Sequence, residues 1–148
     1  FVMKNEIISN LNCGWADFCL GLGYHEKISF IRDIPEDILN GVSSFKATGI
    51  GAIEFDCEGH SFTLLMKESG CLIIEEKNDI QIFEIDEIPN DICLNLFNSV
   101  KNHVEEWVEF QNGNETKEFK ESYKKQIQSR IKIIELMEDL EIYQKLKG

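Results

Sequence analysis

The spacing of apolar residues changes partway along this chain of 148 residues, and that change constrains the fold more than any other feature. From Glu6 to Ile85 apolar and polar residues mostly alternate, as they do in strands that bury one face. From Pro89 onward apolar residues recur every three or four positions, which is the spacing of one helix face. A chain of this length is typical of one domain, so we expect a single α+β domain over residues 1–148.

The alternating part predicts short strands separated by glycine and polar residues. Tight intervals at Glu58-Gly59, Ser69-Gly70 and Asn78-Asp79 are typical of hairpin turns. We therefore expect an antiparallel meander-type sheet of about six to seven strands. The expected strands are Glu6–Asn10, Trp15–Leu20, Lys27–Arg32, Gly51–Asp56, Ser61–Lys67, Cys71–Glu76 and Ile80–Glu84.

The two prolines of the chain share one context, Ile-Pro-x-Asp-Ile, at Ile34–Ile38 and again at Ile88–Ile92. Proline suits the first turn of a helix, because a backbone N–H at that position would have no partner within the helix. An Asp in the first turn complements the positive end of the helix dipole. Each motif therefore predicts a helix start. The residues that follow differ in length and charge, so we interpret the recurrence as one helix-start device used twice rather than as a duplicated unit.

One short helix inserted between strands and two longer C-terminal helices are predicted, over Pro35–Lys46, Pro89–Phe110 and Glu115–Leu146. The last would be about 45 Å long at a rise of about 1.5 Å per residue, so it must project, bend or pack against the helix before it. Its stripe favours packing within the domain, with an oligomer interface as the alternative. The stripe consists of Phe119, Tyr123, Ile127, Ile131, Ile134 and Leu140.

The chain is strongly acidic, with 27 Asp and Glu against 15 Lys and Arg and a net charge of −12. Residues 1–111 carry −13 and residues 112–148 carry +1, so the excess lies in the sheet region and the helix after it. This charge opposes binding to nucleic acid or to anionic membranes, and it favours a basic protein partner.

Two acidic clusters are candidate partner-binding sites. Glu54, Asp56 and Glu58 alternate with apolar residues, so we expect them to project together from one face of a strand. The same carboxylates are also compatible with a solvated sheet face, with a divalent ion, or with a catalytic pair. The second cluster comprises Glu75, Glu76, Asp79, Glu84 and Asp86.

The five cysteines contain no Cys-x-x-Cys pair, so we expect reduced and mostly buried thiols, with no disulfide, zinc site or other metal site. Cys57 and His60 form the one catalytic doublet worth considering, because a thiol nucleophile needs a nearby base. Phosphate-binding loops, nucleophile elbows and metalloprotease motifs are absent from the sequence. We expect a protein that is not an enzyme and needs no cofactor.

No apolar run approaches the roughly 20 residues that span a membrane, and the first eight residues do not match a signal peptide. We therefore expect a cytoplasmic protein. Phe1 and Val2 precede Met3, which is a candidate for the natural first residue.

Three segments carry a resemblance to a known class of proteins: GWADF at Gly14–Phe18, ISFIRDIPEDIL at Ile28–Leu39, and FDCEGHSF at Phe55–Phe62. They resemble small bacterial immunity proteins encoded beside polymorphic toxins, including those of contact-dependent growth inhibition systems. The resemblance covers roughly residues 14–65. It implies an antitoxin that binds a cognate toxin domain in a heterodimer, and it agrees with the acidic charge because nuclease toxins are commonly basic.

Three functions remain open on this sequence. The first is an immunity protein that neutralises a basic, nuclease-type toxin by stoichiometric binding. The second is a non-catalytic adaptor or homo-oligomerisation module that uses the C-terminal helix. The third is a small cytosolic enzyme using Cys57 with His60, or Glu54 with Asp56.

Overall fold

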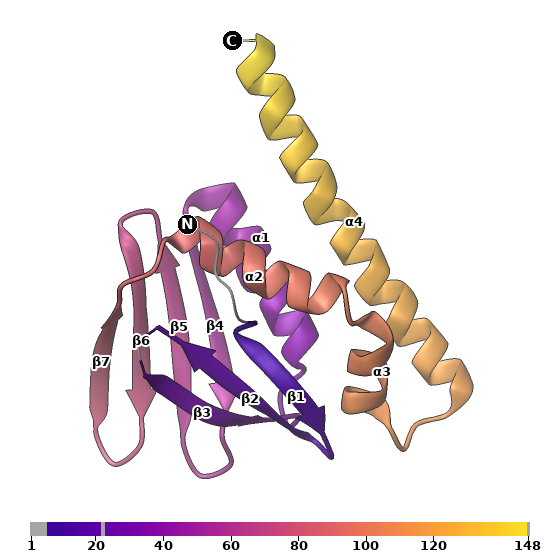
Figure 1. Cartoon of the computed structure of the whole chain (residues 1–148). Coiled ribbons are helices and arrows are strands. Elements are labelled where there is room, and N and C mark those ends of the chain that lie inside the picture. Colours follow the sequence, from indigo (N-terminus) through magenta and orange to yellow (C-terminus); the bar gives the residue numbers. More distant parts are fainter. Residues whose placement is uncertain (1–5, 22, 148) are drawn as a thin grey trace.

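The computed structural model describes residues 6–21 and 23–147, which form two antiparallel sheets and four helices (Figure 1). The fold is α+β, as the sequence predicts. The first sheet contains β1 (Ile8–Asn12), β2 (Trp15–Leu20) and β3 (Tyr24–Ser29). The second contains β4 (Ile50–Asp56), β5 (Ser61–Lys67), β6 (Gly70–Glu76) and β7 (Ile80–Ile85). The helices are α1 (Ile34–Thr48), α2 (Pro89–Lys101), α3 (Val104–Asn112) and α4 (Lys117–Lys147).

The second sheet is the predicted meander, in which each strand pairs antiparallel with the next along the chain. Its inner face carries the expected alternation, and Ile53, Phe62, Leu64 and Ile73 are essentially inaccessible to solvent. The first sheet differs in two strands. The strand predicted at Glu6–Asn10 lies at Ile8–Asn12. The predicted strand at Lys27–Arg32 instead starts at Tyr24 and ends at Ser29, because pairing with β2 runs from Leu20 opposite Tyr24 to Trp15 opposite Ser29.

The predicted single sheet is wrong, since the strands divide into sheets of three and four. Helix α1 separates β3 from β4 in the chain, and the first sheet crosses in front of the second (Figure 1). Phe18 of β2 makes the contact, with its ring centroid 5.0 Å from that of Phe55 and 4.8 Å from that of Phe62. Joining the strands edge to edge would expose these rings, so packing the sheets on each other buries more apolar surface.

Helix α1 starts at the first Ile-Pro-x-Asp-Ile motif, as predicted. The Asp33 side chain caps it by accepting a hydrogen bond from the Glu36 N–H at 3.2 Å, and Gly49 ends it in a left-handed conformation with φ of 81°. Gly41 lies against Ile53 and the backbone of β4, while Gly51 lies against the carbonyl of Gly41. The helix approaches β4 this closely because neither contact point carries a Cβ.

The predicted long helix over Pro89–Phe110 is wrong in its continuity, because the chain breaks between α2 and α3. His103 leaves the helical conformation, with φ of −135° and ψ of 34°. The change of direction places Trp107 against α2, where its indole N–H donates to the Ser99 carbonyl at 2.9 Å and 1% of the residue is exposed. Burying this ring offsets the loss of helical hydrogen bonds at the break.

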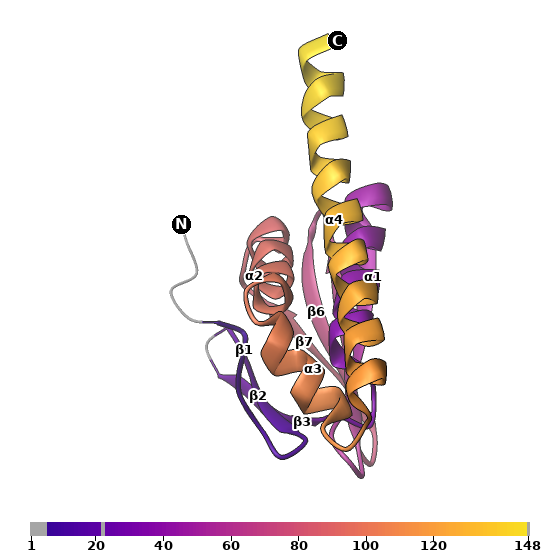
Figure 2. The same ribbon diagram turned by 90° about the vertical axis from the view of Figure 1, so that its right-hand side faces the viewer.

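The first half of helix α4 packs against the domain, and its C-terminal part extends away from it. Tyr123, Ile127, Ile131 and Ile134 of the predicted stripe are buried, whereas Phe119 and Leu140 are exposed. Figures 1 and 2 show the first half of the helix beside α1 and α3, and its C-terminal part extending past the rest of the domain. Thr116 caps its start by accepting from the Phe119 N–H at 3.1 Å.

The thiols match the sequence prediction in part. All five cysteines are free; Cys57, Cys71 and Cys93 are buried, and Cys13 and Cys19 are exposed. Within residues 6–21 and 23–147, no helix combines the length and apolar character needed to cross a membrane.

Candidate functional site

The four-stranded sheet has one buried face, the inner face, and one face that is open to solvent, which we call the outer face. Inner-face side chains of β4, β5 and β6 are buried, while their neighbours on the outer face are exposed or half-buried. The three-stranded sheet and helices α1 and α2 pack on the inner side. The outer face consists of Ile50, Ala52, Glu54, Asp56, Ser61, Thr63, Leu65, Lys67, Leu72, Ile74, Glu76, Ile80, Ile82 and Glu84. Its one lysine, Lys67, lies at the end of β5 opposite Ile50.

The centre of the outer face is apolar. Leu65 pairs with Leu72 across β5 and β6, and Ile74 pairs with Ile82 across β6 and β7. The β7 residues are the most open, since Ile80 is 67% exposed and Ile82 is 63% exposed. Leu65, Leu72 and Ile74 beside them are half-buried. Apolar side chains gathered on one open face are typical of surfaces that bind another macromolecule.

Four of the eight predicted carboxylates border this apolar centre. Glu54 ends one cross-strand row, Asp56 and Glu76 lie in the next, and Glu84 ends the row of Leu65 and Leu72. Glu76 has one weak partner, the Ser61 hydroxyl at 3.5 Å. The arrangement is an apolar surface with an acidic border, which suits a partner whose own apolar patch is flanked by Lys or Arg.

Glu54 is the border residue that is partly neutralised within the chain. Arg32 donates to its Oε2 at 2.6 Å and to Asp37 Oδ2 at 2.8 Å. The hydrogen bond that Arg32 donates to Asp37 is the main cause that raises the pKa of the Arg32 guanidinium, with the charge of Glu54 adding to it. Asp56 Oδ1 accepts a hydrogen bond from the Glu58 N–H at 2.7 Å. Glu76 and Glu84 are therefore the carboxylates of the border that are most available to an incoming cation.

The prediction that Glu58 shares a face with Glu54 and Asp56 is wrong. Strand β4 ends at Asp56, and Glu58 lies in the following turn with φ of 54°. Its Oε2 accepts a hydrogen bond at 2.6 Å from the hydroxyl of Ser29, a residue with 0% exposure in β3. Glu58 thus ties the turn to the other sheet.

Glu75 is also directed away from the outer face, with 7% of the residue exposed. Tyr24 Oη donates to its Oε2 at 2.8 Å, and Lys77 Nζ lies 3.8 Å from the same oxygen. Burial first, and then the bond to Glu75, raises the pKa of Tyr24 well above its usual range. The expected grouping of Glu75 with Glu76 fails because adjacent residues of a strand point to opposite faces.

The last two predicted carboxylates are exposed near β7. Asp79 lies in the turn between β6 and β7, where its carbonyl accepts from the Lys77 N–H at 3.2 Å. Asp86 follows β7 and helps to line a hollow of about 380 Å³ beside Tyr24 and Phe83. With Glu84 and Glu87 on the same hollow, an apolar wall lies next to three carboxylates, which suits the stem and charged head of a Lys or Arg side chain.

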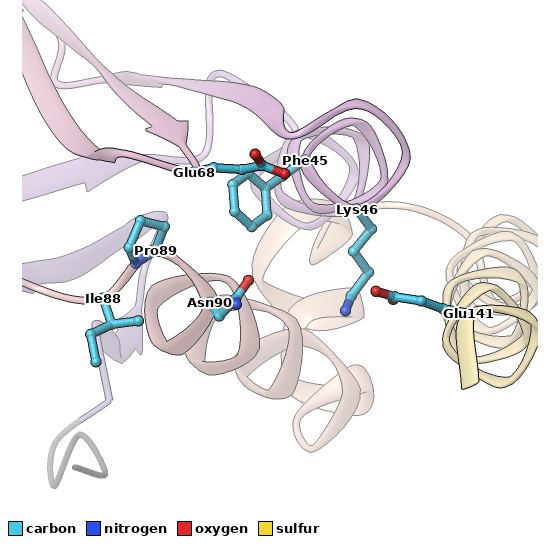
Figure 3. A pocket seen from close by; sticks show the side chains of 7 residues that line it. All are labelled: Phe45, Lys46, Glu68, Ile88, Pro89, Asn90 and Glu141. Carbon is cyan, nitrogen blue, oxygen red and sulfur yellow. The ribbon is translucent and has the colours of Figure 1, made fainter. Parts of the chain in front are cut away.

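A second hollow, of about 390 Å³, lies between the ends of α1, α2 and α4 (Figure 3). Lys46 and Glu141 point toward one another across it, and Glu68 lies over Phe45 (Figure 3). Lys46 is paired with Glu138 of α4, with Nζ and Oε1 2.7 Å apart. One paired lysine and two carboxylates do not form a nucleophile and base, so this hollow does not favour catalysis.

Cys57 and His60, the catalytic doublet of the sequence, do lie together. The Cys57 N–H donates to the His60 carbonyl at 2.9 Å, and Glu26 of β3 joins the two side chains. Burial raises the pKa of the Cys57 thiol to about 12. A protonated thiol is a poor nucleophile near neutral pH, so the raised pKa argues against covalent catalysis by Cys57.

Sequence reasoning missed the apolar centre of the outer face, although a signal was present. Strands β5 and β6 carry apolar residues at adjacent positions, as in Leu64-Leu65 and Leu72-Ile73-Ile74, whereas a strand with one solvated face alternates. It also missed Glu26, for which no local signal exists because its neighbours in the cluster come from the other sheet.

Comparisons of the chain with known protein families, with curated proteins and with solved structures find no match.

Proposed function

We propose that this protein is a non-catalytic inhibitor that neutralises a basic protein by stoichiometric binding, in the manner of an immunity protein that protects a cell from a nuclease-type toxin. The observation that carries the proposal is the outer face, where an apolar centre is bordered by Glu54, Asp56, Glu76 and Glu84. The resemblance of residues 14–65 to immunity proteins and the charge of −13 on residues 1–111 support it.

The proposed mechanism divides the work between charge and apolar contact. A net charge of −12 draws a basic partner toward the protein and speeds encounter, more so at low salt. Ile80 and Ile82 then lose their exposure to water as the partner seats on the outer face, which slows dissociation. Carboxylates that occupy the phosphate-binding surface of a nuclease would exclude its substrate.

The test is co-expression with the toxin encoded immediately upstream in the source genome. We expect growth to be rescued and the two proteins to co-elute as a one-to-one complex. A toxin that still arrests growth, with no complex on size-exclusion chromatography, would overturn the proposed function.

Matched charge variants locate the interface. Glu76→Gln with Glu84→Gln removes two carboxylates from the outer face, and Glu118→Gln with Glu121→Gln removes two exposed ones from α4. We expect the first pair to slow association about tenfold at low salt and the second to leave it nearly unchanged. Equal effects would mean that the toxin binds elsewhere, while rescue of growth by the wild type would still support the inhibitor function.

One observation favours a second candidate, self-association through α4. Ile133, Leu136 and Leu140 are spaced by three and four residues and are 55%, 48% and 62% exposed. This is the spacing of a helix-pair seam. Light scattering coupled to chromatography tests it: a dimer that Leu136→Gln with Leu140→Gln converts to a monomer would establish this role, and a monomeric wild type would exclude it.

A further inference from the structure

Three side chains of different ligand types converge where the two sheets meet. Glu26 comes from β3, while Cys57 and His60 flank the turn between β4 and β5. This turn is tight because Glu58 and Gly59 both adopt positive φ, 54° and 116°, and the Cys57 N–H bonds to the His60 carbonyl. The backbone thereby holds Cys57 and His60 on the same side, facing Glu26.

The ligand atoms are close enough to share one ion. Glu26 Oε2 and His60 Nε2 are 3.2 Å apart, and the carboxylate, imidazole and thiol atoms all lie within 4.8 Å of one another. Bonds of about 2.0 to 2.3 Å place two ligand atoms of a tetrahedral zinc site roughly 3.3 to 3.8 Å apart. The separation of Glu26 Oε2 and His60 Nε2 is close to this range, and the distances to the thiol are at most 4.8 Å.

We propose that Glu26, Cys57 and His60 bind one Zn²⁺ ion, which links the three-stranded sheet to the four-stranded sheet. A set of one sulfur, one nitrogen and one oxygen matches the borderline softness of Zn²⁺. Ca²⁺ and Mg²⁺ prefer oxygen ligands alone, and Cu(I) prefers sulfur. Three protein ligands leave a fourth position for water.

The surroundings make the site mostly buried, with charges of both signs beside it. Cys57 is 6% exposed, and the side chains of Glu26 and His60 are 17% and 24% exposed. Lys77 Nζ lies 3.2 Å from Glu26 Oε1, on the other oxygen from the one that faces His60, so it can remain in place when Oε2 binds the ion. Its positive charge lowers the affinity for a cation, and Glu75 partly offsets that effect.

Binding of Zn²⁺ also releases a proton from the protein. Coordination requires the thiolate, so the Cys57 S–H proton leaves to the buffer as the Zn–S bond forms, and affinity increases with pH. Calorimetry in buffers of different ionisation enthalpy should therefore show release of about one proton per ion.

The experiment uses the untagged, full-length protein and two metals. Co²⁺ reports the ligands, because a thiolate bound to it gives a charge-transfer band in the near ultraviolet. Zn²⁺ affinity is measured by competition with a chromophoric chelator. We expect one saturable site per chain, an intense cobalt spectrum of tetrahedral type, and a rise in melting temperature with Zn²⁺ because the ion binds only the folded chain.

Variants distinguish this site from incidental binding. Cys57→Ser should abolish the thiolate band, and His60→Gln should weaken Zn²⁺ binding by tenfold or more, while Lys77→Gln should tighten it. Cys71→Ser is the matched control, since Cys71 is a buried thiol in β6 outside the cluster. Circular dichroism verifies that each variant is folded.

Two results would overturn the zinc site: an absence of saturable binding by the folded wild type, or binding that Cys57→Ser and Cys71→Ser alter equally, which would indicate an adventitious ion only. His60→Gln provides a separate measure if Cys57→Ser fails to fold. Inhibition of a toxin through the outer face does not depend on either result, so the two proposals fail independently.

Discussion

Glu75 and Glu76 are adjacent in β6, yet their surroundings are opposite. Glu75 is 7% exposed and accepts from the Tyr24 hydroxyl, whereas Glu76 is exposed on the outer face. The carboxylate of Glu75 therefore contributes to the contact between the two sheets. Of the two, only Glu76 is placed to contact a partner at the outer face.

This contrast gives the first prediction. Glu75→Ala should lower the free energy of unfolding by about 1 to 3 kcal/mol, because it leaves the Tyr24 hydroxyl half-buried without its acceptor. Glu76→Ala should change that free energy by less than about 0.5 kcal/mol. Urea unfolding of both variants makes the comparison, and equal stabilities would show that the Tyr24 contact contributes nothing.

His103 lies at the break between α2 and α3, with Glu106 Oε1 3.0 Å from Nδ1 and Glu6 Oε1 3.1 Å from Nε2. The hydrogen bond to Glu106, followed by the one to Glu6, raises the pKa of His103 above its ordinary value of 6.5. The charged form of the imidazole is thus favoured in the folded state.

The second prediction concerns pH. Because the folded-state pKa of His103 is raised, its stabilising contribution is complete below the unfolded-state pKa and is lost as pH rises through the folded-state pKa. The stability difference between wild type and His103→Gln should therefore be largest below about pH 6.5 and shrink as the pH rises above that value. Urea titrations at several pH values measure this difference. In a chain that carries Glu6→Gln and Glu106→Gln, the effect of His103→Gln on stability should depend less on pH. A difference that grows with pH would contradict the assignment.

At the scale of elements, the two Ile-Pro-x-Asp-Ile motifs start helices in different ways. Asp33 Oδ1 caps α1 and also accepts from the Tyr123 hydroxyl of α4 at 2.7 Å. The equivalent position before α2 is Glu87, but there the cap residue is Ile88 and no side chain makes a cap hydrogen bond. One motif thus connects two helices, and the other only begins one.

The third prediction compares these two positions. Asp33→Ala should cost about 1 to 3 kcal/mol of stability, since it removes a helix cap and the partner of a buried tyrosine hydroxyl. Glu87→Ala should cost less than about 0.5 kcal/mol. Thermal and chemical unfolding measure both, and Tyr123→Phe separates the contact with α4 from the cap. A larger loss at Glu87 would contradict this account.

For the whole molecule, α4 divides into a part that stabilises the domain and a part that extends from it. Ile131 is 6% exposed against the body of the protein, whereas Leu140 is 62% exposed. The fourth prediction is that Ile131→Ala lowers the unfolding free energy by about 2 to 4 kcal/mol, because a cavity remains. Leu140→Ala should change it by less than about 0.5 kcal/mol in a monomer. Concentration-dependent unfolding that Leu140→Ala removes would instead indicate self-association.

Much of the fold could be predicted from sequence, because strands and helix starts depend on neighbouring residues. The meander of β4 to β7 and both proline-led helix starts are confirmed. Long-range packing decided the rest: Trp107 reaches back to Ser99 and breaks the predicted long helix, and Phe18 packs on Phe55 across two separate sheets. Neither contact leaves a local pattern.

The candidate site shows the same division. Alternation placed Glu54 and Asp56 on one strand face correctly, because side chains reverse direction at every residue of a strand. Alternation also implies that Glu75 and Glu76 point apart, but it does not say which of them faces the other sheet. The sequence by itself determined the acidic charge, the meander and the helix starts, since these follow from composition and local backbone preference. Only the tertiary structure decided which carboxylates are buried, which sheet face is left open, and that Glu26 meets Cys57 and His60, because those outcomes depend on contacts between residues far apart in the chain.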